Sequence, residues 1–226
     1  KKINIIELGA GNGEMMHQMT KVFKKFEKFL KASKFFIFEK SHFLKKIQKK
    51  KITSFNVSWI NSLDNIKNGP NIFLANEFFD ALPVKQFIKK NNKWFEKKVK
   101  VLNKNNFELV NEPTNINKLE KKIGINLKNN QKVIEFSPMT YKYLKTISKK
   151  INAFQGGLLI IDYGYFEEEM KNSLQSVRKH KFSNILESFG NSDITYNISF
   201  FLLEKILKKL NLKVVGTTTQ KKFLTK

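Results

Sequence analysis

The chain has 226 residues, enough for one domain with a full hydrophobic core, and it contains no cysteine. Disulfides, a thiolate nucleophile and a cysteine-based metal site are therefore excluded, and no apolar stretch reaches the roughly 18 residues that a membrane-spanning helix needs. The net charge of +24 suggests a nucleic-acid partner, but Arg178 is the only arginine among 43 basic residues and the lysines are spread along the whole chain, which favours a compositional bias over a binding patch.

Short apolar runs alternate with amphipathic segments along the chain. INIIEL (3–8) is β-branched and predicts a buried strand, and the apolar residues of 14–31 recur at helical spacing. The same patterns predict a lysine-rich helix at 41–50 and four more strands, at 35–39, 54–59, 71–77 and 156–164. Buried strands that alternate with helices are typical of a parallel sheet with helices on both faces.

Between the fourth and fifth of these strands the pattern changes. Residues 84–90, 93–102 and 106–110 have the pattern of three strands joined by Asn-rich turns, which predicts a small antiparallel meander. The remaining expected elements are a polar loop with a short helix at 111–130, a helix capped by Ser137 and begun by Pro138, an irregular stretch to about 197, a helix at 199–210 and a strand at 212–219. Without internal repeats or a Pro-rich linker, the sequence predicts a single α/β domain over 1–226 with an insertion at 84–110.

The turn after the first strand, ELGAGNGE (7–14), carries the clearest ligand signal. Gly9, Gly11 and Gly13 alternate, and Glu14 stands where a dinucleotide fingerprint would have its third glycine. A carboxylate in the first turn of a helix would compete with a bound phosphate for the helix dipole. The sequence therefore predicts a ligand that is not held by phosphates, and the alternative is a tight turn that binds nothing.

S-adenosylmethionine fits this turn, because it has no phosphate and is cationic at its sulfonium and amino groups. Glu7 and Glu14 favour positive charge, and Glu39 closes the second strand, where one carboxylate can accept both ribose hydroxyls. Ser58 and Trp59 end the third strand, where we expect a side chain to contact the adenine. The expected cofactor site consists of Glu7, Gly9, Gly11, Gly13, Glu39, Ser58 and Trp59.

The fourth strand ends in ANEFFDALPV, which places Asn76, Glu77 and Asp80 at the same edge of the sheet as the glycines. Carboxylates beside a methyl donor suit a guanidinium, because they fix its plane and can take the proton that its nitrogen loses. Methyl transfer is an in-line displacement, so alignment of the reacting atoms supplies much of the catalysis. The alternative is that Asn76 and Asp80 cap a helix that begins near residue 79 or 81.

Several segments occur in an order that resembles the MidA family of S-adenosylmethionine-dependent methyltransferases: ELGAGNG, FEKS, VSW, NEFFDALPVKQF, GGLLIIDYG, LQSVRKH and SDITYNISF. The resemblance covers nearly the whole chain, and NEFFDALPV is far more specific than the glycines. It implies a Rossmann-like class I methyltransferase fold, in which the glycines and Glu39 hold the cofactor. The family's characterised activity is symmetric dimethylation of an arginine in a subunit of respiratory complex I, which implies a protein substrate. The location that this implies is the bacterial cytoplasm, or the mitochondrial matrix for a eukaryotic source.

The sequence also departs from the family pattern. The glycine turn lacks the usual proline and arginine, and Asn197 and Ser199 stand where the family has His and Asp. Asp193 remains in that segment, and we take it and Asp162, at the end of the fifth strand, as substrate-site candidates; capping explains Asp162 equally well. Family members carry segments before and after this region, so we expect the chain to be truncated at both ends.

Two other functions stay open. The altered YNIS segment is compatible with an assembly or docking protein. Such a protein would keep the fold, and it could bind the cofactor, but it would not transfer a methyl group. The net charge alone suggests an RNA methyltransferase, against which the scarcity of arginine and of stacking aromatics counts. A metal centre is not expected, because His17, His42 and His180 show neither HxH nor HExxH spacing.

Overall fold

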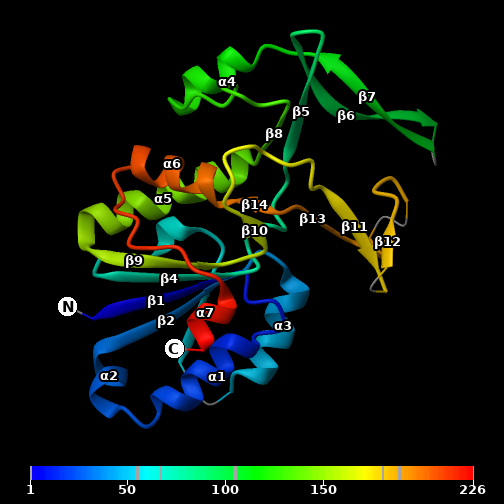
Figure 1. The fold of residues 1–226 in the computed structure, drawn as a ribbon. Helices are drawn as coiled ribbons and strands as arrows, with labels where there is room; N and C mark the ends of the chain where they lie inside the picture. Colours follow the sequence, from blue (N-terminus) through cyan, green and yellow to red (C-terminus); the bar gives the residue numbers. More distant parts are fainter. Residues whose placement is uncertain are drawn as a thin grey trace. The chain divides into compact units, whose positions relative to one another are not determined.

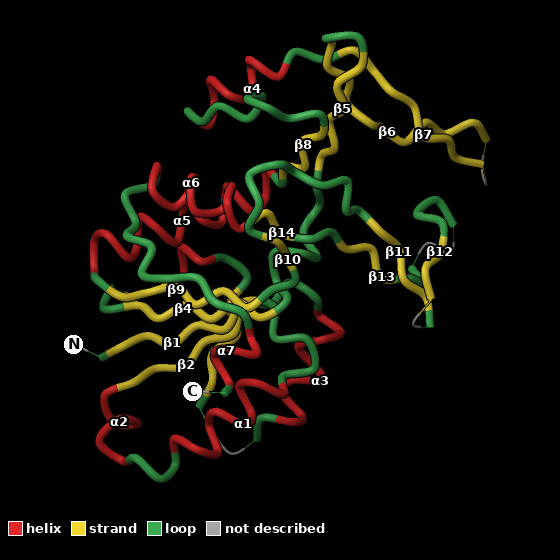
Figure 2. The backbone as a smooth tube through the Cα atoms, viewed as in Figure 1, coloured by secondary structure: helices red, strands yellow, loops and turns green. Residues whose placement is uncertain are grey.

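The computed structural model describes residues 2–53, 56–66, 68–103, 106–179, 181–187 and 190–225. The chain divides into two compact units, of which the first comprises Lys1–Phe78, Tyr143–Asp162 and Leu210–Lys226 and the second Phe79–Lys142 and Tyr163–Lys209. Each unit has its own sheets (Figure 1, Figure 2). The expectation of one functional domain over 1–226 stays a prediction.

The first unit contains a five-stranded parallel sheet with the order β3-β2-β1-β4-β9 (Figure 1). Its strands are β1 (Ile3–Leu8), β2 (Ser33–Phe38), β3 (Val57–Ile60), β4 (Asn71–Asn76) and β9 (Gly156–Ile161). All five correspond to strands that the sequence predicts, although residues 54 and 55 of the predicted third strand lie outside the described residues. The parallel α/β sheet is therefore confirmed.

Helices cover both faces of this sheet. On one face, Met16 of α1 (Glu14–Phe23) joins a buried cluster with Ile5 and Phe35, and α2 (Glu27–Ala32) and α3 (His42–Lys51) continue this layer. On the other face lies α5 (Pro138–Phe154), whose Tyr143 ring is 5.4 Å from the ring of Phe38. The unit also contains the short 3-10 helix η1 (Leu63–Asn65) and α7 (Gln220–Leu224).

The helix predicted at 14–31 is broken into α1 and α2. Phe26, expected on the apolar face, is 55% exposed and has a non-helical backbone at the break. The break brings Phe29 against Phe23, with ring centroids 4.8 Å apart, and Phe23 also stacks on Phe35 of β2 at 5.8 Å. Packing of three aromatic rings thus outweighs the continuous helical spacing of the sequence.

The second unit is built mainly from antiparallel strands. Its largest sheet has the order β7-β6-β5-β8 and contains β5 (Lys85–Lys90), β6 (Lys93–Asn103), β7 (Asn106–Pro113) and β8 (Val133–Phe136). The meander is confirmed, and β8, which the sequence does not predict, adds a fourth strand. Residues 104 and 105 of the turn between β6 and β7 lie outside the described residues. The helices of this unit are α4 (Ile116–Ile123) and α6 (Phe200–Lys209).

Two predicted segments of irregular or extended chain need correction. The stretch before residue 197 contains short strands: β12 (Lys181–Ser183), β11 (Gln175–Arg178) and β13 (Asp193–Thr195) form an antiparallel sheet, and β10 (Gly164–Tyr165) pairs with β14 (Ile198–Ser199). The strand predicted at 212–219 is wrong, because this segment pairs with no neighbour and Val215 is 93% exposed. His180, quoted in the family motif, lies outside the described residues.

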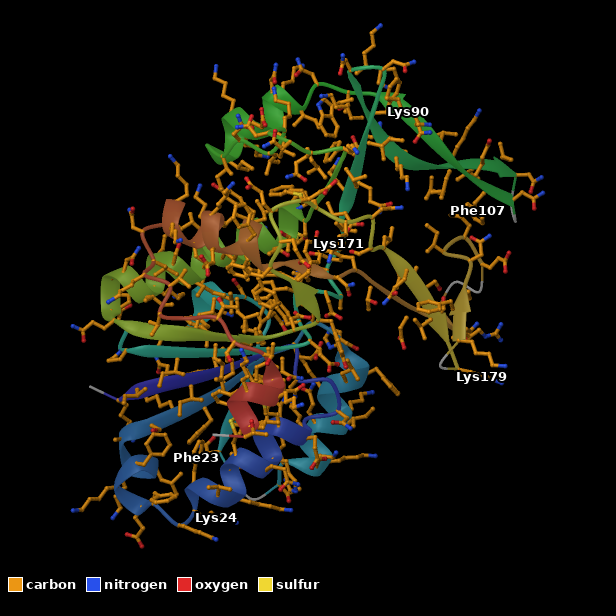
Figure 3. The ribbon with its side chains drawn as sticks, viewed as in Figure 1. Phe23, Lys24, Lys90, Phe107, Lys171 and Lys179 are labelled. Atoms are coloured by element: carbon orange, nitrogen blue, oxygen red, sulfur yellow. The ribbon has the colours of Figure 1, made fainter. Side chains whose placement is uncertain are left out.

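The lysines of the described residues lie on the surface of each unit rather than in one cluster. Figure 3 shows this for Lys24, which follows α1 in the first unit, and for Lys90 and Lys179 in the second. Among the helices that the structure describes, none combines the length and the apolar character that crossing a membrane requires.

Candidate functional site

The carboxyl ends of the parallel strands gather most of the predicted site residues in the first unit. Because β1, β2 and β4 run in the same direction, they end at the same edge of the sheet. The glycine turn follows β1, Glu39 follows β2, and Asn76 and Glu77 close and follow β4. Asp162 follows β9 at the same edge. The structure thus places these residues in one region of the unit.

The turn between β1 and α1 is formed by three glycines with φ angles of 63° at Gly9, 52° at Gly11 and 82° at Gly13. Other residues rarely adopt this left-handed region. The N–H of Gly9 donates to the carbonyl of Phe38 at 2.9 Å, which ties the turn to β2. Gly11 is exposed, and a Cβ built on it would meet no heavy atom within 4 Å. The turn therefore leaves its backbone open to a ligand at Gly11.

Glu39 is a buried carboxylate held by two donors. Its Oε1 accepts the N–H of Ser41 at 2.8 Å, and its Oε2 accepts Nε2 of Gln48 at 3.1 Å. A carboxylate has about four acceptor positions, so each oxygen keeps one position for a further donor. Two neighbouring hydroxyls, as on a ribose, match this pair of acceptors.

Gln48 is the residue that the sequence analysis misses. It lies on α3 between lysines, in the stretch KKIQKKK, which has the pattern of a solvated face, and yet its side chain is fully buried. The signal that could have found it is a single uncharged amide on a helix whose other polar residues are almost all lysines.

Ser58 and Trp59 lie inside β3, which ends one residue later than expected, at Ile60. Their side chains alternate across the sheet. Trp59 is half-buried and packs against the α1 face, and its indole N–H donates to Oε1 of Gln48 at 2.9 Å. Ser58 is exposed. A contact of either residue with an adenine stays a prediction.

Glu7 is a buried acid directly before the glycine turn. Burial raises the pKa of Glu7 to about 7, and a hydrogen bond from the N–H of Met16, in the first turn of α1, offsets part of this rise. Among the described residues, Oε2 of Glu7 has no hydrogen-bond partner. The site therefore contains a carboxyl group whose charge changes near neutral pH.

Glu14 does not supply the uncompensated negative charge expected from the sequence. It is exposed, and its Oε2 lies 2.6 Å from Nζ of Lys51 on α3. Hydrogen bonds from Lys51 and Gln18 lower the pKa of Glu14 to about 2. The pair joins the first turn of α1 to the last turn of α3, so its role is to connect these helices.

The end of β4 presents polar side chains in a strained turn. Asn76 and Glu77 are exposed, and Glu77 has a φ of 47° while its N–H donates to the carbonyl of Ile161 at 2.9 Å. A non-glycine residue in this region costs about 1 to 2 kcal/mol, and such strain is concentrated at functional sites. No helix begins between 77 and 84, so the alternative explanation of Asn76 and Asp80 as helix caps is wrong.

The other predicted acids are distributed over the two units. Asp80 is buried in the second unit, and its carbonyl accepts the N–H of Tyr196 at 3.3 Å. Asp193 also belongs to the second unit, where it is exposed at the start of β13, whereas the half-buried Asp162 belongs to the first. Their roles toward a substrate stay predictions.

A pocket within the second unit is bordered by the altered family segment. Asn197 and Ser199 both line it, together with the buried Glu135 of β8. The carboxylate of Glu135 accepts Nε2 of Gln86 at 2.6 Å and the N–H of Ser173 at 2.9 Å, so its hydrogen bonding is satisfied by uncharged donors. The two altered positions of the YNIS segment, Asn197 and Ser199, thus lie at one pocket.

Comparison with known proteins shows the family to which the chain belongs. A family described as putative S-adenosyl-L-methionine-dependent methyltransferases matches residues 1–218. The chain is 24% identical over 258 aligned positions to the mitochondrial protein arginine methyltransferase NDUFAF7 of Xenopus tropicalis, covering 99% of this chain and 57% of that protein. It is 28% identical over 174 positions to the mitochondrial NDUFAF7 homologue of Caenorhabditis elegans, covering 76% of this chain and 41% of that protein. The chain thus spans about half the length of these relatives.

A solved structure supports the fold. A crystal structure from Burkholderia thailandensis, bound to S-adenosyl-homocysteine, superposes with a TM-score of 0.80 at 18% identity, covering 99% of this chain and 60% of that one. At this identity the likeness concerns the fold alone, and it confirms the Rossmann-like arrangement expected from the sequence.

Proposed function

We propose that this chain, which belongs to the family of putative S-adenosyl-L-methionine-dependent methyltransferases, binds S-adenosyl-L-methionine at the glycine turn and methylates an arginine of a protein. The observation that carries the proposal is the open backbone at Gly11 together with the two remaining acceptor positions of Glu39. The first feature lets a ligand approach the backbone of the turn, and the second matches the two neighbouring hydroxyls of a ribose.

The roles of the chain's own residues follow from their placement. When bound, the cofactor supplies a methyl group on a sulfonium. We assign Asn76 and Glu77, exposed at the end of β4, to the orientation of the guanidinium, because amide and carboxylate oxygens accept its planar donors. We assign to Glu77 the proton that the methylated nitrogen loses. Alignment of the acceptor, rather than a covalent intermediate, supplies the catalysis.

The protein substrate is proposed from the relatives. The relatives described above are named as protein arginine methyltransferases of mitochondria. We extend this activity to the present chain and, on the family resemblance, propose a subunit of respiratory complex I as the substrate. The corresponding location is the bacterial cytoplasm, or the mitochondrial matrix if the source is eukaryotic.

Calorimetric titration of S-adenosylmethionine and S-adenosylhomocysteine tests the proposal. Wild type should bind both ligands. Gly11→Val should bind neither, because its side chain fills the open space beside the backbone, and Glu39→Ala should bind neither, because it removes the acceptors for the ribose hydroxyls. Glu27→Ala is the matched control, since Glu27 is an exposed carboxylate paired with Lys31 on α2. Folded wild type that binds neither ligand would refute the proposal.

A second candidate is an assembly or docking protein that binds the cofactor without turnover. It is favoured by the position of Asn197 and Ser199 at the second-unit pocket, where the family pattern has ionisable residues. Cofactor binding in calorimetry, combined with no methyl transfer to any protein fraction from labelled cofactor, would distinguish it from the enzyme.

A further inference from the structure

We propose that Gln48 is a positioning residue, which holds the glycine turn, the ribose-binding carboxylate and the strand β3 in the arrangement that the cofactor requires. The inference rests on the proposed function, because it concerns the site where S-adenosyl-L-methionine would bind. It goes beyond that function because it names a side chain that does not contact the ligand and yet affects how tightly the site binds it.

Among the described residues, the partners of the Gln48 amide are all predicted cofactor-site groups. Its Nε2 donates to the carbonyl of Gly11 at 2.8 Å and to Oε2 of Glu39 at 3.1 Å. Its Oε1 accepts the indole N–H of Trp59 at 2.9 Å. The side chain is 0% exposed and both of its N–H groups are used, so no donor is left for a ligand. Gln48 therefore acts through Gly11, Glu39 and Trp59.

The fold brings Gln48 to the turn by close packing of α3. A Cβ at Gly13 would lie 3.2 Å from Cγ and 3.4 Å from Cα of Gln48, so only glycine permits this approach without displacement. Ser41 fixes the start of α3, since its side chain accepts the N–H of Leu44 at 3.2 Å and its own N–H donates to Glu39. The helix start and the third glycine thus both fix the position of Gln48.

The chemistry of an amide suits this place better than any other side chain of similar length. A lysine would neutralise Glu39 and occupy it with a charge-assisted bond. A glutamate would repel Glu39 and has no donor for the carbonyl of Gly11. A methionine would fill the space but leave buried polar groups without partners. Glutamine orients Glu39 and leaves its negative charge available to the ribose.

Three variants test the proposal by calorimetry with S-adenosylhomocysteine. Gln48→Met should weaken binding about tenfold to a hundredfold, which is the range expected when residues that orient a site are lost. Gln48→Glu should weaken it further, because it adds repulsion of Glu39. Gln131→Met is the matched control: Gln131 is also a buried glutamine, and it bonds the backbone of Glu168 and Met170 in the second unit. We expect its affinity to stay within about twofold of wild type.

A second readout separates positioning from loss of stability and does not need a ligand. Amide hydrogen exchange of residues 9–13 should accelerate in Gln48→Met, because the turn loses the bond at Gly11, and should stay unchanged in Gln131→Met. Unchanged affinity and unchanged exchange in folded Gln48→Met would overturn the proposal, as would an equal loss of affinity in Gln131→Met. If wild type binds no ligand, the proposed function fails and the exchange data alone decide the positioning role.

Discussion

The buried acid Glu7 makes the stability of the first unit depend on pH near neutrality. Burial raises the pKa of Glu7 from its ordinary value of 4.5 to about 7. A raised pKa in the folded state means that the folded protein binds the proton more tightly than the unfolded chain does. The stabilisation is therefore complete below pH 4.5 and is lost as the pH rises through 7.

The magnitude follows from the difference between the two pKa values. At about 1.4 kcal/mol for each pH unit, wild type should lose about 2 to 3 kcal/mol of unfolding free energy from this group between pH 5 and pH 8. Glu7→Gln cannot titrate and should not show this loss. Its stability relative to wild type should therefore rise by the same amount across that range.

Urea unfolding at pH 5, 6, 7 and 8 measures the difference. A Trp94→Phe background leaves Trp59 as the only tryptophan, so the fluorescence reports on the parallel sheet. Glu14→Gln is the control, because the pKa of Glu14 is shifted in the opposite direction, to about 2. The contribution of Glu14 to the unfolding free energy is therefore lost only below pH 4.5. The stability of this control should run parallel to that of wild type between pH 5 and 8. A Glu7→Gln profile parallel to wild type would refute the reasoning.

Two further predictions concern packing at the turn and the start of α5. Gly13→Ala should lower the unfolding free energy, measured in urea, by about 2 to 3 kcal/mol, because it adds the 3.2 Å contact with Gln48 to left-handed strain. Gly11→Ala should lower it by only about 1 kcal/mol, because its Cβ meets no atom, and equal losses in the two variants would contradict the packing role. Ser137→Ala should cost about 1 kcal/mol, because its Oγ accepts the N–H of Thr140 at 3.1 Å; an unchanged unfolding midpoint would show that this cap contributes nothing.

The elements that could be predicted are those whose sequence pattern is local and strong. The parallel strands appear as continuous apolar runs because both faces of the sheet are covered, and β1 illustrates this, since the successive residues Ile5 and Ile6 are both buried. Ser137 before Pro138 predicts the start of α5 from the chemistry of two adjacent residues. The polar ends of strands predict a shared edge, because parallel strands end together.

The features that could not be predicted depend on contacts between distant segments. β8 has only four residues and pairs with β5, from which it is separated in the sequence by β6, β7 and α4. Phe26 fits a helical pattern, and only the packing of Phe23 against Phe29 explains why the helix breaks there. Gln48 was missed because burial of a polar residue between lysines depends on the glycine that it approaches across the fold.

The three glycines of the turn differ in what a side chain at each position would meet. A Cβ at Gly9 would lie 2.7 Å from the ring of Phe78, and one at Gly13 would lie 3.2 Å from Gln48, but one at Gly11 would meet nothing. All three glycines have a left-handed φ, and close protein atoms add a second reason for Gly9 and Gly13, whereas the space beside Gly11 stays open to a ligand. In a relative in which Phe78 or Gln48 is replaced by a smaller residue, we expect loss of the matching glycine to cost only the left-handed strain and not the clash, whereas we expect a large side chain at Gly11 to block the proposed cofactor.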